Sequence, residues 1–159
     1  MHLVSRALPI LLVACAAAVA LPTLADGNQR KTNAPLLAKY RQECAACHVA
    51  YPPALLPAAS WQRVMATLPR HFGTDASFDA STVRELSGWL AAHAGSGKGA
   101  SEPPPQDRIT RSAWFVRKHD EVASAAWKLP AVKSPANCSA CHTQADQGDF
   151  NEHRVRIPR

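Results

Sequence analysis

Residues 44–48 read Cys-Ala-Ala-Cys-His, and residues 138–142 read Cys-Ser-Ala-Cys-His. Two cysteines three positions apart, followed at once by a histidine, are the attachment signature of c-type haem. Thiols at this spacing add to the two vinyl groups of one porphyrin, and the histidine supplies an axial nitrogen to the iron. The two copies predict two covalently attached haems, with His48 and His142 as iron ligands. The attaching thiols are those of Cys44, Cys47, Cys138 and Cys141.

Two other kinds of site also use Cys-x-x-Cys pairs. Zinc ribbons and fingers place their pairs close in sequence, with about 12–20 residues between them. Here 90 residues separate Cys47 from Cys138. A thioredoxin-like redox motif belongs near a βαβ unit, and nothing in the sequence indicates one. Because a histidine also follows each pair directly, haem attachment is the better interpretation.

The first 25 residues have the pattern of a secretory signal peptide. Arg6 gives the positive start, residues 7–21 are almost unbroken in their apolar character, and Thr23-Leu24-Ala25 offers small residues at the positions that determine cleavage. We expect cleavage after Ala25 and export to the periplasm, since bacterial haem attachment takes place after export. No later stretch is apolar enough to predict a membrane span.

Two alternatives for this leader stay open. Residues 12–15, Leu-Val-Ala-Cys, resemble a lipoprotein box in which Cys15 becomes a lipidated N-terminus, although the chain then stays apolar where a lipoprotein continues with a polar tether. The apolar run is also nearly long enough to remain as an uncleaved anchor. Its alanine-rich composition and its cleavage site favour removal.

The chain is basic, but its cofactors would offset most of that charge. The formal net charge is +6, and it is +5 without the leader, where Arg6 is the only charged residue. Four propionate groups on two haems would lower the net charge to about +1, so a nucleic-acid partner does not follow from the composition. Residues 153–159 stay locally basic; this tail could dock an acidic partner, contact a propionate or be solvated.

A stretch rich in glycine, serine and proline divides the chain. Residues 95–105, GSGKGASEPPP, cannot continue a helix or a strand ladder, so we interpret them as a linker. One haem motif lies on each side of it. We therefore expect a signal peptide at 1–25, an N-terminal haem domain at 26–94 and a C-terminal haem domain at 106–159. The 134 residues after the leader bury a limited core, of which two porphyrins would form a large part.

The spacing of apolar residues predicts a mainly α fold. In the first half we expect helices over 35–44, from a cap at Ser60 to a bend at Pro69, and from Asp79 or Ser81 to Gly95. This order resembles a compact class I cytochrome c. In the second half we expect one helix over about 109–127, followed by loops around the haem.

Each motif supplies one axial ligand, so the other ligand of each iron must come from elsewhere. Two filled positions favour electron transfer, whereas an open position permits binding of a gas or a peroxide. Met65 lies in an apolar helical stripe and is interpreted as a core residue. His93 shares a helix face with leucines and is interpreted as packed, and His153 lies in a charged segment and is interpreted as exposed.

His71 and His119 are the predicted distal ligands. His71 follows a proline-terminated helix and precedes Gly73, in a loop that can approach a haem face. His119 lies four residues after Phe115 and three before Val122, and these apolar neighbours suit a haem pocket. We expect the axial pairs His48/His71 and His142/His119. Bis-histidine ligation predicts lower reduction potentials than histidine–methionine ligation.

Several motifs together resemble the small soluble dihaem cytochrome c family of proteobacteria. The resemblance covers nearly the whole chain after the leader. It rests on residues 43–48 followed by Tyr-Pro-Pro at 51–53, LPRHFG at 68–73, RSAWF at 111–115 with Lys-His at 118–119, the motif at 138–142, and GDF at 148–150 with VRIP at 155–158. The resemblance implies two domains, bis-histidine haems on His71 and His119, and a role as electron donor to an oxygen-binding monohaem cytochrome c.

The predicted function is that of a periplasmic electron carrier, not an enzyme. Its expected partners are redox proteins, a monohaem cytochrome c and a membrane cytochrome. The alternative is the small dihaem subunit of periplasmic nitrate reductase, which is also exported and bis-histidine. A dihaem peroxidase or a gas sensor would need an open iron site, and the peroxidase roughly twice the chain length.

Overall fold

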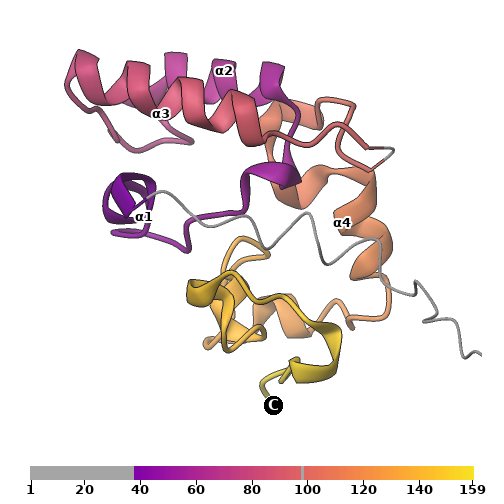
Figure 1. Cartoon of the computed structure of the whole chain (residues 1–159). Coiled ribbons are helices and arrows are strands. Elements are labelled where there is room, and N and C mark those ends of the chain that lie inside the picture. The colour runs from indigo at the N-terminus through magenta and orange to yellow at the C-terminus, as the bar shows by residue number, and fades with distance from the viewer. Residues whose placement is uncertain (1–37, 98) are drawn as a thin grey trace, which may run out of the picture.

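The computed structural model describes residues 38–97 and 99–159, so the expected leader and the start of the first helix lie outside the described residues. The described chain is helical, which confirms the predicted fold class. Its α-helices are α1 (Ala38–Cys44), α2 (Ala58–Ala66), α3 (Ala80–His93) and α4 (Ala113–Lys118), joined by 3-10 turns. None of the helices in this part is both long and apolar enough to cross a bilayer. In Figure 1, α2 and α3 lie side by side at the top, and the C-terminal segment forms the lower part.

The helix α2 begins earlier than the sequence predicts. Pro57 precedes it, and the Pro57 carbonyl accepts hydrogen bonds from the backbone N–H groups of Ser60 and Trp61 at 3.0 and 3.2 Å. The predicted cap at Ser60 is therefore wrong, and this serine is fully buried inside the helix. Met65 is buried on the expected apolar face, which confirms its packing role.

The helix α3 begins where the sequence predicts. The Asp79 carboxylate accepts hydrogen bonds from the backbone N–H groups of Ser81 and Thr82, both at 2.9 Å, which satisfies donors that a helix start leaves free. Leu86 and Leu90 lie about one and two helical turns after Thr82, and neither has any exposed surface. These leucines belong to a core shared with α1 and α2, whose other buried members are Tyr40, Ala50, Leu56, Trp61, Met65 and Leu68.

Gly95 allows the chain to cross closely over the first half after α3. Its N–H donates to the Leu56 carbonyl at 2.8 Å. A Cβ at this position would lie 2.4 Å from the Ala54 carbonyl oxygen, which is closer than real Cβ contacts come. Glycine is therefore required here for packing, and the predicted helix stop is also a tertiary contact.

The long helix predicted over 109–127 is broken in the structure. It is replaced by a 3-10 turn at Ile109–Arg111, the short helix α4 and a 3-10 turn at Ala126–Lys128. In a continuing α-helix, the backbone N–H of His119 would donate to the Phe115 carbonyl. Here the Nδ1 atom of His119 takes this carbonyl, at 2.9 Å, and α4 ends. Its own N–H bonds to the Val116 carbonyl instead. The side chain that we expect to bind iron thus terminates the helix.

Residues around the expected linker pack on the first half. Asp107 forms an ion pair with Arg63 of α2, with Nη2 and Oδ1 2.7 Å apart. Ile109 packs against the core of the first half, whereas Gly99 of the linker lies against Trp114 of α4 in the second half. Asp107 and Ile109, which follow the expected linker, thus contact the first half. The division of the chain at 95–105 stays a prediction.

Candidate haem-binding sites

His48 and His71 come from separate segments and face each other. Their ring centres are 6.2 Å apart, and the ring planes differ by 24°. A metal–imidazole bond is about 2.0 Å long and the ring centre lies roughly 1 Å beyond the nitrogen, so two axial imidazoles on one metal ion have centres about 6 Å apart. The first predicted pair therefore has the separation that one iron between the rings requires.

His119 and His142 form a second facing pair. Their ring centres are 6.1 Å apart, but here the ring planes differ by 72°. His142 follows the 3-10 turn Cys138–Ala140, and its N–H donates to the Cys138 carbonyl at 2.8 Å. The structure thus brings together both predicted histidine pairs, with equal separations and different relative orientations.

Backbone carbonyls orient two of these four imidazoles. The Nδ1 atom of His48 lies 2.7 Å from the Val49 carbonyl, and that of His119 lies 2.9 Å from the Phe115 carbonyl. A carbonyl oxygen only accepts hydrogen bonds, so each Nδ1 is the donor, and in the neutral ring the lone pair on Nε2 is then the one that can bind a metal. The Nδ1 of His142 is buried and has no partner among the described residues.

The surroundings of two histidines favour their neutral form. Burial lowers the pKa of His71, and the neighbouring His48 and Arg108 lower it further. Burial and then His119 lower the pKa of His142, although Asp149 acts in the opposite direction. A neutral imidazole is the form that binds a metal. Both environments therefore suit metal ligation.

No disulfide joins the four motif cysteines to one another. Burial raises the pKa of Cys44 and of Cys138 to about 11 in each case. A redox-active dithiol depends on a lowered thiol pKa, so this direction argues against the thioredoxin-like alternative. Within residues 38–97 and 99–159, no group of three or more His, Cys, Asp or Glu side chains could hold a metal ion, so the cysteines do not meet at a zinc site. Motif cysteines that form no disulfide, next in sequence to facing imidazoles, fit two covalently bound haems.

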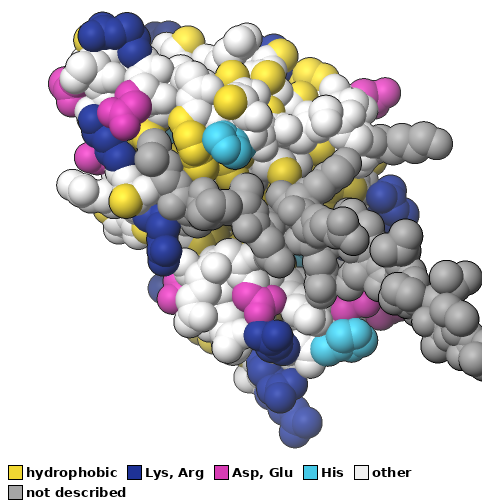
Figure 2. All heavy atoms as spheres, in the orientation of Figure 1, with side chains coloured by type: hydrophobic (Ala, Val, Ile, Leu, Met, Phe, Trp, Pro, Cys, Tyr) yellow, Lys and Arg dark blue, Asp and Glu magenta, His cyan; other side chains and the backbone are white. Residues whose placement is uncertain are grey.

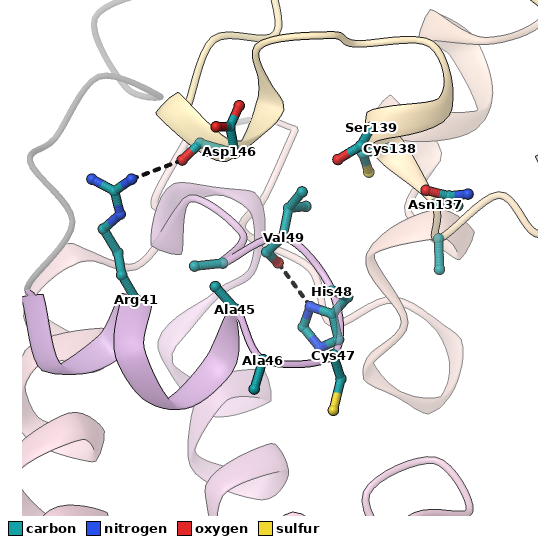
Figure 3. A pocket seen from close by; sticks show the side chains of 12 residues that line it. Arg41, Ala45, Ala46, Cys47, His48, Val49, Asn137, Cys138, Ser139 and Asp146 are labelled. Carbon is teal, nitrogen blue, oxygen red and sulfur yellow. Dashed lines mark hydrogen bonds between the residues drawn. The ribbon is translucent and has the colours of Figure 1, made fainter.

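A cavity of about 560 Å³ lies between the two cysteine motifs (Figure 3). Residues 45–50 line one side of it and residues 136–139 the other. Two hydrogen bonds join its sides: Arg41 Nη2 donates to the Asp146 carbonyl at 3.1 Å, and Tyr51 Oη donates to the Ala136 carbonyl at 2.8 Å. The two haem-binding segments are therefore neighbours in space.

Aromatic rings pack against the candidate ligands. Phe115 stacks on His119 with ring centres 4.0 Å apart, as the four-residue spacing predicts. Tyr51 stacks on His48 at 4.8 Å, and Phe150 lies 5.5 Å from His142. The contacts of Tyr51 were not predicted from the sequence. Its position three residues after His48 was the one local signal, and its hydrogen bond to Ala136, two residues before the second motif, had no local signal.

The other candidate histidines do not pair with a histidine in the described part of the chain. His93 is exposed, its Nδ1 lies 2.8 Å from the Trp89 carbonyl and its ring packs on Trp89. His153 is exposed, as the sequence predicts. Both environments differ from those of His71 and His119, which are partly buried and face another imidazole.

The basic tail folds back on the second motif. The Arg156 N–H donates to the Cys141 carbonyl at 2.9 Å, and Val155 forms an isolated antiparallel bridge with His142. Arg154 pairs with Asp149. Figure 2 shows Lys and Arg atoms at the lower edge of the molecule, where Figure 1 marks the C-terminus. The tail backbone thus borders the second site while its arginine side chains stay exposed.

Comparisons with known proteins agree on one family. Residues 40–150 match a family model described as dihaem cytochrome c. The chain is similar to the solved dihaem cytochrome c of Shewanella baltica, with 39% identity, a TM-score of 0.68, and coverage of 79% of this chain and 95% of that one. A dihaem cytochrome c from Rhodobacter sphaeroides is 44% identical, with a TM-score of 0.64 and coverage of 73% and 98%. None of the curated proteins matches. The matched range includes both motifs and both histidine pairs.

Proposed function

This chain belongs to the dihaem cytochrome c family of electron-transfer proteins and carries two covalently attached c-type haems. We propose that it carries single electrons between redox partners in the periplasm. When bound at these residues, a haem would supply one-electron chemistry through the ferric and ferrous states of its iron. The observation that carries the proposal is the second histidine that faces the histidine of each motif, at 6.2 and 6.1 Å between ring centres.

The side chains divide into attachment and ligation. Cys44 and Cys47 hold the first haem, and the second motif holds the other through Cys138 and Cys141. The pairs His48/His71 and His142/His119 would supply the two histidine ligands of each iron. Filled positions keep small molecules from the metal, which suits electron transfer and leaves no site for a peroxide or a gas.

The periplasm is the proposed location, and redox proteins are the proposed partners. The export pattern of residues 1–25 supports the location, and c-type cytochromes are typically exported. The resemblance noted above supports an oxygen-binding monohaem cytochrome c as acceptor and a membrane cytochrome as donor. Mass spectrometry of the mature protein tests the location: we expect one chain that starts at Asp26 and carries two haems, and a lipidated Cys15 would contradict this.

A reductive titration tests the electron-carrier proposal. We expect the purified holoprotein to take up two electrons per chain, one per haem, and to show a six-coordinate, low-spin spectrum in both oxidation states. Carbon monoxide should leave the Soret band of the reduced protein unchanged, because histidines fill the axial positions. Rapid stoichiometric binding of carbon monoxide by either haem would contradict the proposal.

The two ferric haems should give different electron paramagnetic resonance signals. Near-parallel imidazole planes interact with the same iron d orbital and split the two d orbitals of π symmetry, whereas near-perpendicular planes leave them close in energy and make the g-values more anisotropic. With ring planes at 24° in the first site and 72° in the second, we expect one rhombic and one strongly anisotropic low-spin signal, each from half of the iron. Two identical signals would contradict the ligand geometry.

A further inference from the structure

His71 lies beside a strained turn. The next residue, Phe72, has a φ of 49°, and Gly73 has a φ of 103°. Glycine adopts this left-handed region easily, but phenylalanine does so only where its surroundings hold it. A 3-10 turn at Leu68–Arg70 precedes the strained residues, and the Thr74 N–H closes the turn by donating to the His71 carbonyl at 3.0 Å. The conformation that carries His71 therefore depends on contacts made by Phe72.

Two groups hold the Phe72 ring. The His71 ring lies edge-on to it, with centres 4.8 Å apart and planes at 62°. The guanidinium carbon of Arg108 lies 4.4 Å from the ring centre, within the range of a cation–π contact. Phe72 is 46% exposed, so its ring is held by these two contacts and not by burial in a hydrophobic pocket. A charged side chain from beyond the linker thus supports a turn of the first half.

The backbone that carries Arg108 is itself anchored on the first half. Its neighbour Asp107 accepts two hydrogen bonds from the Arg63 guanidinium, at 2.7 and 2.9 Å, and such a bidentate pair fixes orientation as well as distance. A small cavity of about 120 Å³ separates this segment from the turn, and His71, Phe72 and Asp107 line it. The end of α2, the turn at residues 71–74 and the segment at residues 106–108 therefore lie next to one another.

We propose that Arg108 is a positioning residue for His71: its guanidinium, stacked on Phe72, holds the strained turn so that His71 stays facing His48. This inference rests on the proposed bis-histidine ligation of the first haem. Loss of the stack leaves Phe72 in a disfavoured conformation with one contact fewer. The turn then opens more often, and the position that His71 fills becomes accessible to another ligand.

The rate at which the reduced holoprotein binds carbon monoxide tests this role. Arg108→Gln removes the charge, and we expect binding at the first haem to become about two- to fivefold faster, the factor that an exposed cation–π contact supplies. Arg108→Lys keeps a cation over the ring and should restore a rate close to that of the wild type. Arg111→Gln is the matched control, because Arg111 is exposed on the following 3-10 turn and bonds to Gln106 rather than to Phe72.

A double-mutant cycle with Phe72→Leu checks that Arg108 acts through the ring. If it does, the double variant should bind carbon monoxide no faster than Phe72→Leu alone, since contacting residues do not act additively. The spectrum of the His71→Ala adduct identifies the first haem, and an unchanged melting temperature shows that the fold is retained.

The outcomes separate this inference from the proposed function. Rapid binding of carbon monoxide by the wild type would overturn the bis-histidine proposal. If the wild type resists and Arg108→Gln resists equally, only the positioning role is overturned. Equal acceleration in Arg108→Gln and Arg111→Gln would also overturn it, because a general loss of positive charge would then explain the effect.

Discussion

His71→Ala is expected to open the first haem to carbon monoxide while the second haem stays closed. The variant removes one imidazole of a pair whose ring centres are 6.2 Å apart, and no other described histidine or methionine faces His48. Binding should rise from none detected to one equivalent per chain, measured on the Soret band of the reduced protein. His119→Ala should open the second haem alone in the same way, because His142 is the one histidine of the described residues that His119 faces.

Two controls accompany these variants. His93→Ala and His153→Ala remove exposed imidazoles, so both haems should stay closed to carbon monoxide. Free imidazole added to His71→Ala should refill the axial position and restore a low-spin spectrum. If His71→Ala opened the second haem instead, the histidines would pair across the two halves, and the pairs seen in the structure would be wrong.

Local signals in the sequence predicted the parts of the fold that depend on neighbouring residues. Asp79 caps α3 through backbone groups two and three residues away, and Leu86 and Leu90 follow a helical repeat. Both features can therefore be predicted from the sequence. The cysteine motifs are equally local, because the thioether geometry requires their fixed spacing. The candidate cofactor sites could therefore be predicted before any fold was known.

The break after α4 shows where periodicity fails. Apolar residues continue at helical spacing beyond His119, yet the imidazole takes the Phe115 carbonyl and the helix ends. A side chain that competes for a backbone acceptor leaves no mark on the hydrophobic pattern.

Contacts between distant segments were beyond prediction from one sequence. Tyr51 reaches Ala136 across 85 positions, and Arg108 reaches Phe72 from the other side of the expected linker. Neither contact follows from spacing, because the approach of the two halves decides both. The ring angles of the two histidine pairs are not predictable from spacing either, since the two rings of each pair come from segments at least 23 positions apart.

The two halves differ in how much apolar core they contain without a cofactor. Among the described residues, nine buried hydrophobic side chains lie in the first half and three in the second, and the three are Phe115, Val132 and Ala145. The first half also has α2 packed against α3, whereas the second has the six-residue α4 and 3-10 turns. A small domain with so little apolar burial needs another source of stability, and a covalently bound haem supplies one.

Replacing both cysteines of the second motif should therefore unfold more of the chain than replacing both cysteines of the first motif. Cys138→Ala/Cys141→Ala should lose one haem by mass and should unfold the second half. We expect protease cleavage within 106–159 to accelerate, since proteolysis follows the population of the open state and the lost haem no longer stabilises the folded one. Cys44→Ala/Cys47→Ala should also lose one haem but keep α2 and α3 protected, because Leu86 and Leu90 stay buried against Trp61 and Met65. Hydrogen exchange followed by mass spectrometry reads both halves of each variant. Equal loss of protection in the two halves would show that the haems, and not the apolar core, stabilise both.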